Sequence, residues 1–298
     1  MPSRQLLAFA GLLVSCLCWA GNALVARAFY SAIPPLSLSF WRWSLALAIL
    51  LPFVAVPLWR ERHKVIRGGW RLVLLAALGI SGYNSLLYTA AHSTVAINIT
   101  LVNTCLPLAT YLGAGVLLNE WPPRRAWFGM AMAAIGLITL ISRGSLANLL
   151  ALSFNPGDLI MLVAVLVWAL YTLLLRRWSP RFELPPLALL GALVLLGVPI
   201  ILPFYLVELS QVGGFEPSPA NLAAIGYTAV FASLLAYLTW NHGVKVVGAA
   251  KAALTSYLMP VFAALLAYLL LGETLEVFHW LGGALIFGGL LLATRPGR

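Results

Sequence analysis

Long apolar stretches separated by short polar ones run through all 298 residues of the chain. A membrane-spanning helix needs about 20 predominantly apolar residues. Ten stretches meet this requirement: 6–28, 36–59, 71–90, 95–118, 125–142, 157–178, 184–207, 220–242, 247–271 and 277–294. Their apolar residues recur with the helical period and do not alternate strictly, which favours helices over an outer-membrane barrel. The pattern predicts an all-α polytopic membrane protein with ten transmembrane helices.

Composition supports this prediction. Hydrophobic residues make up 62% of the chain, charged residues only 9%, and the mean hydropathy is +0.97. Soluble domains are about 45 to 50% apolar and about 25% charged, so a soluble fold is excluded. The first apolar stretch follows Arg4, as a signal peptide would, but it is long and lacks a small-residue cleavage pattern. We expect it to be a retained helix.

The second half of the chain repeats the first. Five residues of the first half recur 153 positions later (260 − 107): Pro107, Glu120, Trp127, Gly129 and Gly136 match Pro260, Glu273, Trp280, Gly282 and Gly289. Earlier residues recur 149 positions later, among them Trp19 as Trp168 and Arg27 as Arg176. With five spans in each half, the second copy must be inverted in the membrane, as in alternating-access transporters. We therefore predict two repeats, 1–148 and 149–298, around a central cavity.

The net charge of +10 is explained by topology. If both termini share one side, that side receives Arg4, Arg60, Arg62, Lys64, Arg67, Arg71, Arg124, Arg125, Arg176, Arg177, Arg181, Lys245, Arg295 and Arg298. The other side receives only Arg27 and Arg143. Positive residues concentrate in cytoplasmic loops, which predicts cytoplasmic termini and a multi-pass protein of the bacterial inner membrane. The lipid bilayer is then its surroundings, and no nucleic-acid partner is expected.

Catalytic and metal-binding patterns are missing from the sequence. It contains no His-Glu-x-x-His, Gly-x-Ser-x-Gly, P-loop or Gly-x-Gly-x-x-Gly motif. The acidic residues fall at span ends or in loops, and the three cysteines lack ligand partners at metal spacing. A channel would need a filter or a ring of charges. We predict a transporter that is not an enzyme and needs no cofactor or metal.

Polar and aromatic residues gather on spans 6–28, 71–90, 95–118, 157–178, 220–242 and 247–271, whereas the other four spans are mainly aliphatic or polar only near an end. The candidate substrate-binding residues are Trp19, Asn22, Tyr83, Asn84, Tyr88, His92, Asn98, Asn103, Trp168, Tyr171, Tyr237, Trp240, Asn241, Lys251 and Tyr257. Each residue alone could instead form an interhelical hydrogen bond or sit at the lipid interface. The shared helix face of Asn84, Tyr88 and His92 favours a cavity, because a lipid-facing Asn or His would be costly.

Two cations within predicted spans are assigned to neither side of the membrane, Lys251 and Arg42. Lys251, the repeat equivalent of Asn98, lies about one turn from a span end. It either extends to the interface or contacts a substrate carboxylate. Arg42, near the outer end of its span, is expected to be structural and to reach the headgroups or a neighbouring helix end, with a role in the binding site as the alternative.

Prolines and glycines at equivalent positions predict further features. Pro107 and Pro260 each remove a backbone donor mid-helix, so we expect two symmetric kinks that act as hinges. The glycines of 125–142 and 277–294 permit close helix packing. They either join these two spans within the chain or form a homodimer, so the protein is expected to be a monomer or a dimer through these spans.

The run from Gly248 to Ala264, followed by Leu271-Gly272-Glu273 and a glycine-rich last helix, resembles the EamA repeat of the drug/metabolite transporter superfamily. Phe40-Trp41-Arg42-Trp43, Pro107 and Leu118-Asn119-Glu120 resemble its first copy. Within the superfamily the chain is also similar to YddG-type exporters of aromatic amino acids. The resemblance implies ten helices, cytoplasmic termini and a central cavity.

The combined hypothesis is a secondary transporter that exports aromatic or other neutral amino acids and related small metabolites by alternating access, driven by the substrate gradient. One alternative is a proton-coupled drug or metabolite exporter, with His92 or His242 carrying the proton. A second alternative is a membrane scaffold that transports nothing.

Overall fold

The computed structural model describes residues 3–94, 96–152, 155–271 and 274–294, and every regular element in this part of the chain is a helix. The elements are α1 (Ser3–Ala28), α2 (Pro35–Arg60), α3 (Arg62–Ala76), η1 (Ala77–Gly82), α4 (Tyr83–Ser93), α5 (Ala96–Asn103), α6 (Cys105–Leu118), α7 (Arg124–Ile141), α8 (Leu146–Leu150), α9 (Pro156–Phe182), α10 (Pro186–Val212), α11 (Pro219–Tyr227), η2 (Thr228–Leu235), α12 (Ala236–Val247), α13 (Ala249–Thr255), η3 (Ser256–Leu258), α14 (Met259–Leu271) and α15 (Val277–Thr294). Alone or joined end to end, they form 10 helices long and apolar enough to cross a membrane. The all-α, ten-span prediction is confirmed.

Helix boundaries follow local sequence signals. Prolines open α2, α9, α10 and α11, where the missing N–H costs no helical hydrogen bond. At the start of α9, Asn155 and Asp158 form a reciprocal capping box. Gly213 closes α10 in the left-handed conformation, which glycine adopts without strain. The long spans therefore begin and end where the sequence dictates.

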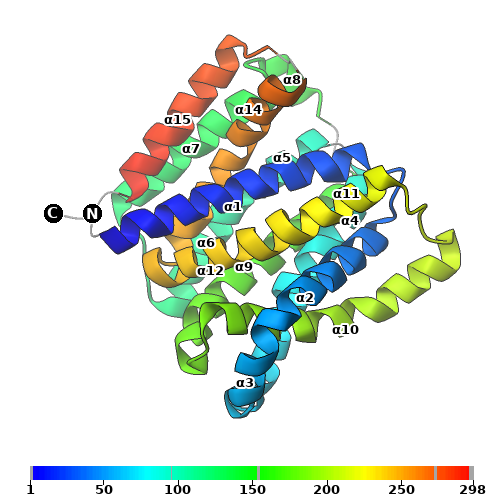
Figure 1. Ribbon diagram of the computed structural model, residues 1–298. Helices are drawn as coiled ribbons and strands as arrows, with labels where there is room; N and C mark the ends of the chain where they lie inside the picture. Colours follow the sequence, from blue (N-terminus) through cyan, green and yellow to red (C-terminus); the bar gives the residue numbers. More distant parts are fainter. Residues whose placement is uncertain (1–2, 95, 153–154, 272–273, 295–298) are drawn as a thin grey trace.

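The spans pack as three groups (Figure 1). At one edge, α7 lies beside α15, and at the other α2 packs with α10 and α3. Between them, α1 packs against α12, and α9 packs against α4 and α6. The central group holds the helices predicted to line a cavity. The outer groups contain the spans predicted to be peripheral, together with α3, which is the first part of the third span.

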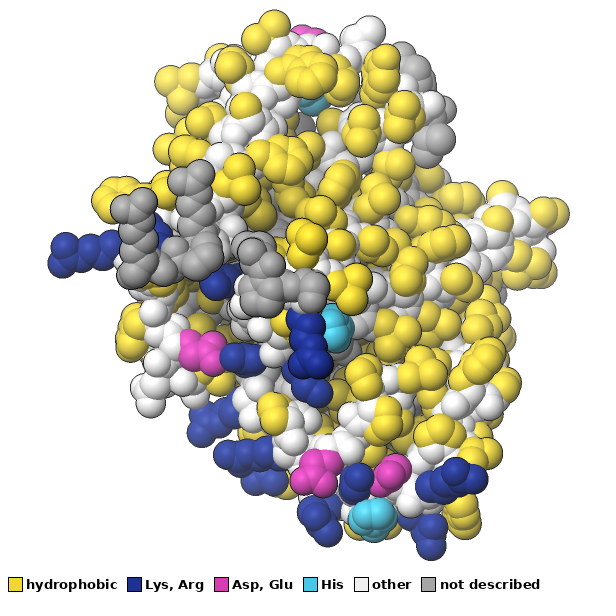
Figure 2. Space-filling model, turned by 60° about the vertical axis from the view of Figure 1, so that its left-hand side comes forward, with side chains coloured by type: hydrophobic (Ala, Val, Ile, Leu, Met, Phe, Trp, Pro, Cys, Tyr) yellow, Lys and Arg dark blue, Asp and Glu magenta, His cyan; other side chains and the backbone are white. Residues whose placement is uncertain are grey.

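Basic side chains gather at one end of the bundle (Figure 2). Hydrogen bonds hold several helix ends together there: Lys64 donates to the Glu183 carbonyl, Arg177 to the Leu117 carbonyl and Arg176 to the Lys245 carbonyl. We call this end, with Lys64, Arg176, Arg177 and Lys245, the basic end. The far end, where Thr94 meets Asn155, is called the opposite end.

The inverted repeat is visible in local backbone geometry. A π-helical stretch interrupts the third span at η1 and the eighth span at η2. The fourth span breaks at Thr104, between α5 and α6, and the ninth span breaks at η3, which is centred on Tyr257, 153 residues later (257 − 104). Each break lies three residues before a proline (107 − 104 and 260 − 257). The helices break there because Pro107 and Pro260 cannot donate a hydrogen bond to the carbonyls four residues earlier. Both helices are interrupted beside the predicted prolines; bending there and service as hinges remain proposals.

Glycines join α7 directly to α15. A Cβ atom on Gly129 would lie 2.4 Å from the Gly289 carbonyl oxygen, and one on Gly136 would lie 2.6 Å from the Gly282 carbonyl oxygen. Only glycine permits this backbone approach. Both glycine stripes are thus occupied within the chain. These glycines are therefore not available to a second copy of the chain, and a homodimer through them is not favoured.

Two adjacent glycines of α15 provide a test of this packing. A Cβ atom on Gly282 would lie 2.6 Å from Leu140 Cγ and 2.7 Å from the Gly136 carbonyl oxygen, whereas one on Gly283 would meet nothing within 4 Å. Overpacking should make Gly282→Ala less stable by about 1 to 3 kcal/mol. Gly283→Ala should be neutral or stabilising by up to about 1 kcal/mol, through helix propensity. Thermal unfolding in detergent measures both, and equal melting temperatures would contradict the seam.

Candidate functional site

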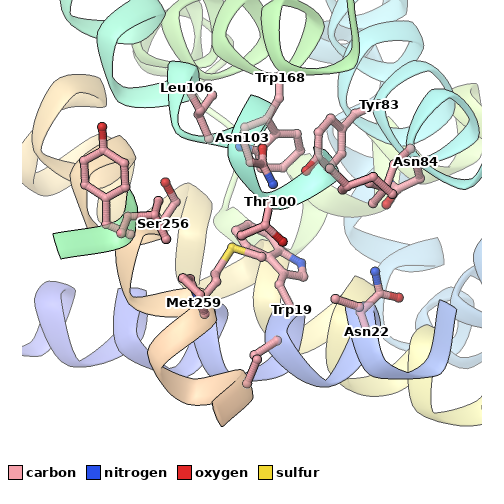
Figure 3. A pocket seen from close by; sticks show the side chains of 18 of the residues that line it. Trp19, Asn22, Tyr83, Asn84, Thr100, Asn103, Leu106, Trp168, Ser256 and Met259 are labelled. Atoms are coloured by element: carbon pink, nitrogen blue, oxygen red, sulfur yellow. The ribbon is translucent and has the colours of Figure 1, made fainter. Parts of the chain in front are cut away.

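A central cavity of about 190 Å³ lies between the two repeats (Figure 3). All six spans predicted to line a cavity contribute to it, together with Leu137 of α7. The lining residues are Trp19, Ala20, Asn22, Ala23, Tyr83, Asn84, Leu87, Ile99, Thr100, Asn103, Leu106, Leu137, Trp168, Tyr237, Ser256, Tyr257, Met259, Pro260 and Ala263. Among these described residues there is no Asp, Glu, Lys, Arg or His. The wall is therefore aromatic and aliphatic, with a few neutral polar groups.

Aromatic rings form one side of this cavity. Trp19 packs edge-on against Trp168, with ring centroids 5.3 Å apart, and against Tyr237 at 5.9 Å. Tyr83 continues the cluster, 4.9 Å from Trp168. Trp240 lies 5.1 Å from Trp19 and is fully buried outside the lining. Interlocked rings of this kind form a rigid apolar surface.

Repeat-equivalent residues meet each other at the cavity. Trp19 contacts its counterpart Trp168. The amide nitrogen of Asn84 donates to the hydroxyl of Tyr237, its equivalent 153 residues later (237 − 84), at 2.9 Å. The hydroxyl of Tyr257 donates to the carbonyl of its own equivalent, Thr104, at 3.0 Å. A residue contacts its own copy only near a twofold axis, so a local twofold axis passes through this cavity.

The remaining candidate residues lie outside the central cavity. Tyr88, Tyr171 and Trp240 are buried behind its wall, and Asn98 is buried against Asp158. His92 lines a second cavity at the opposite end, and Asn241 lines a third at the basic end. The eight candidates brought together are Trp19, Asn22, Tyr83, Asn84, Asn103, Trp168, Tyr237 and Tyr257.

Lys251 is partly buried on α13 and is not among the described residues that line these cavities. This placement favours the interfacial alternative over contact with a substrate carboxylate.

Arg42 is the residue that sequence reasoning misplaced. Its side chain is fully buried, where we expected it to reach headgroups or a helix end. It donates to Ser233 at 2.8 Å and to the side-chain oxygen of Asn84 at 3.1 Å, and it also contacts Asn22 and Tyr88. A signal was present in the sequence: Arg42 stands seven residues into α2, about 10 Å from its start. That depth disfavours contact with headgroups.

The central cavity adjoins the cavity at the opposite end. That second cavity, of about 580 Å³, shares Ala23, Leu87, Ile99 and Thr100 with the central lining. The cavity at the basic end, of about 550 Å³, shares none of its lining with the central one. Of these two cavities, the one at the opposite end adjoins the site and the one at the basic end does not.

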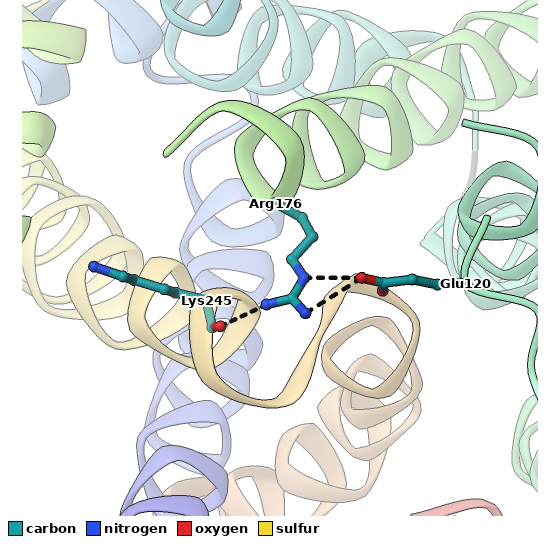
Figure 4. A network of polar contacts seen from close by, with 3 residues as sticks. All are labelled: Glu120, Arg176 and Lys245. Carbon is teal, nitrogen blue, oxygen red and sulfur yellow. Dashed lines mark hydrogen bonds and ion pairs between the residues drawn. The ribbon is translucent and has the colours of Figure 1, made fainter. Parts of the chain in front are cut away.

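A polar network closes the basic end (Figure 4). The Arg176 guanidinium on α9 lies 3.3 Å from the Glu120 carboxylate, which follows α6, and donates to the Lys245 carbonyl on α12 at 2.6 Å. Three spans are linked by this one side chain. The ion pair is partly exposed, so it contributes at most about 1 kcal/mol to stability and suits a contact that opens.

Asp158 is a buried carboxylate near the opposite end, at the start of α9. It accepts hydrogen bonds from the Thr94 hydroxyl, the Asn98 amide and the Asn155 backbone N–H. Because its oxygens are engaged by donors on three segments, it stabilises helix ends and does not face the central cavity.

Comparison with known proteins agrees with this architecture. The EamA-like transporter family model matches residues 6–142 and 155–295, one match in each repeat. The chain is 29% identical to the transporter YyaM of Bacillus subtilis over 87% of this chain and 84% of the relative. It is 28% identical to the inner membrane transporter YedA of Escherichia coli over 98% and 92% of the two chains. The names of these relatives specify no substrate.

A solved crystal structure shares the fold. It superposes with a TM-score of 0.78 at 21% identity and covers 98% of this chain and 96% of its own. Two family matches across nearly the whole chain, ten spans and a cavity between two inverted repeats lead to one conclusion. The protein is a multi-pass membrane transporter that belongs to the EamA-like transporter family.

Proposed function

We propose that this protein exports aromatic or other neutral amino acids and related small metabolites across the bacterial inner membrane by alternating access. The observation that carries the proposal is the central cavity, placed on the local twofold axis and walled by Trp19, Tyr83, Trp168 and Tyr237. Flat aromatic surfaces stack favourably on aromatic cargo. The eight candidate residues in the lining are the proposed contacts.

Orientation follows from charge. Basic residues favour the cytoplasmic side, so the basic end and both termini are assigned to the cytoplasm. In this orientation the structure is closed toward the cytoplasm by Arg176 and Glu120. Its cavity reaches toward the outside. We infer that this is the state in which cargo leaves.

The two backbone breaks are proposed to be the hinges of the transition. Asn103 and Ser256 stand four residues before Pro107 and Pro260, so their carbonyls lack the usual α-helical donor, and both residues line the cavity. Bending at these positions would change the cavity wall directly. Cargo in the cavity thereby couples to the movement of α6 and α14.

Transport is proposed to follow the substrate gradient, because the described lining carries no titratable acid or histidine. Proton coupling is the second candidate, and one observation favours it. His92 lines the cavity at the opposite end, and histidine changes charge near neutral pH.

Counterflow in proteoliposomes tests this function. Vesicles loaded with unlabelled phenylalanine, tryptophan or threonine should accumulate the labelled amino acid whether or not a pH gradient is imposed, since no proton is needed. A quaternary dye serves as the drug-like comparison. Lack of uptake for every amino acid would contradict the substrate proposal, and uptake that requires the gradient would favour the proton-coupled alternative.

Substitution of two tryptophans distinguishes a role of the cavity from a role of the lipid-facing surface. Trp168 lines the cavity, whereas Trp280 on α15 is 68% exposed. Trp168→Leu should lower phenylalanine counterflow at least about tenfold through loss of aromatic contacts, each worth about 0.5 to 1.5 kcal/mol. Trp280→Leu should leave counterflow unchanged. Equal effects of the two substitutions would argue that the cavity does not hold the cargo.

The closure at the basic end is tested by Glu120→Gln. Removal of one partner of an exposed ion pair should change stability by less than about 1 kcal/mol. It should nevertheless favour opening toward the basic end. A cysteine placed by Asn103→Cys, with the native cysteines replaced by serine, should react faster with a membrane-impermeant thiol reagent added from that end. Unchanged reactivity would show that this network does not hold the end closed.

A further inference from the structure

Arg42 has an unusual environment for a buried cation. Its Nε donates to the Ser233 hydroxyl at 2.8 Å, and Nη1 contacts the side-chain oxygens of Asn84 and Asn22 at 3.1 and 3.4 Å and the Tyr88 hydroxyl. The second terminal nitrogen, Nη2, is buried and has no hydrogen-bond partner in the described part of the chain. One donor group of the guanidinium is therefore unused in this state.

All these hydrogen-bond partners are neutral. The ion pairs among the described residues are Glu61 with Lys64 and Glu120 with Arg176, both far along the sequence from Arg42 and on the basic end. The buried Asp158 is engaged by its own donors. Buried charges in proteins are normally paired, and an ionisable residue inside a membrane protein marks a functional site. The charge of Arg42 thus lacks a counter-charge.

The guanidinium lies directly behind the wall of the central cavity. Asn22 and Asn84 both line the cavity and both direct their side-chain oxygen at Arg42. The amide nitrogen of Asn84 is used by Tyr237. The amide of Asn22 lies at the edge of the cavity (Figure 3), and its hydrogen bonds to described residues use the oxygen, not the nitrogen. The cavity wall therefore presents a hydrogen-bond donor, the Asn22 amide nitrogen, with the positive charge of Arg42 directly behind it.

We propose that this part of the wall, Asn22 with Arg42 behind it, binds the carboxylate of the cargo. The inference rests on the proposed function and assigns the carboxylate to Arg42 in place of Lys251. Asn22 donates to the carboxylate in the state described. Nη2 becomes a second donor when the Asn22 side chain turns aside. Guanidinium is well suited to carboxylate because its donors are fixed in a plane.

A carboxylate fits this site better than a phosphate group does. A phosphate group carries a charge of about −1.5 to −2 at neutral pH. Arg42 supplies one positive charge, and the described cavity lining contains no other cation. A single negative charge is neutralised by Arg42 alone.

The test compares ligands that differ only in the carboxylate. Full-length protein in detergent is titrated with phenylalanine and phenylalaninamide, and with acetate, acetamide and inorganic phosphate at constant ionic strength. Tryptophan fluorescence gives the readout, because Trp19 lines the cavity and Trp43 lies 5.2 Å from the Arg42 guanidinium. The variants are Arg42→Gln, Arg42→Lys and Asn22→Asp. Arg67→Gln, at an exposed arginine, is the matched control.

Wild type and Arg67→Gln should bind phenylalanine at least about tenfold more tightly than the amide, the size expected for one charge-assisted hydrogen bond. Arg42→Gln should abolish this preference, and Arg42→Lys should restore part of it. Asn22→Asp places a carboxylate of the protein against Arg42, so it should bind phenylalanine at least tenfold more weakly and melt at or above the wild-type temperature. If Arg42→Gln does not fold, Asn22→Asp carries the test.

Several results would overturn the inference: an unchanged preference in Arg42→Gln, undiminished phenylalanine binding in Asn22→Asp, or phosphate bound more tightly than acetate. Failure of the proposed function is distinguishable from these. If no amino acid undergoes counterflow but acetate binding still depends on Arg42, the carboxylate site stands and the cargo is another organic acid. If counterflow proceeds normally in Arg42→Gln, the proposed function stands and this inference fails.

Discussion

Hydrocarbon surroundings require the protein to satisfy its polar groups internally. Hydroxyl groups on the helices meet this constraint locally, as Thr110 and Thr172 do by donating to carbonyls one turn earlier. Side chains that cannot be satisfied in this way are drawn toward the centre of the bundle. The Arg42 cluster is the extreme case, since it collects donors and acceptors from four helical elements. The polar interior is a consequence of the apolar exterior.

The same constraint explains where the backbone is irregular. π-helical turns and proline breaks release hydrogen-bonding groups, which is tolerated at membrane depth only where protein or a cavity covers them. Both copies of the repeat place these irregularities in the third and fourth spans of their half, and these spans contribute to the cavity wall. The outer pairs α7 with α15 and α2 with α10 have no π-helical stretch. The π-helical turns thus lie in spans that contribute to the cavity wall.

The two halves of the chain are related by a local twofold axis, but the charge of Arg42 does not follow this symmetry. The local twofold axis joins Asn84 to Tyr237 and Thr104 to Tyr257, so that the halves share one interior. The positive charge behind this interior has no matching cation on the other half, because Gly191 stands 149 residues after Arg42 (191 − 42). Arg42 itself is held by Ser233 of the second copy. An asymmetric charge in a symmetric cavity would give a cargo a preferred orientation.

The amino-acid sequence by itself determined the ten spans, the inverted repeat, the breaks near Pro107 and Pro260, and six of the seven spans that line the cavity. Each of these depends on local hydrophobicity, backbone chemistry or periodicity. It also determined eight of the lining residues. The sequence could not predict that Glu120 and Arg176 form an ion pair. It also could not decide whether the glycines join two spans of one chain or two copies, because both questions depend on which helices become neighbours. Burial of Arg42 was likewise decided by tertiary structure: a span exposes one face to lipid and another to protein, and only packing determines which face carries the charge.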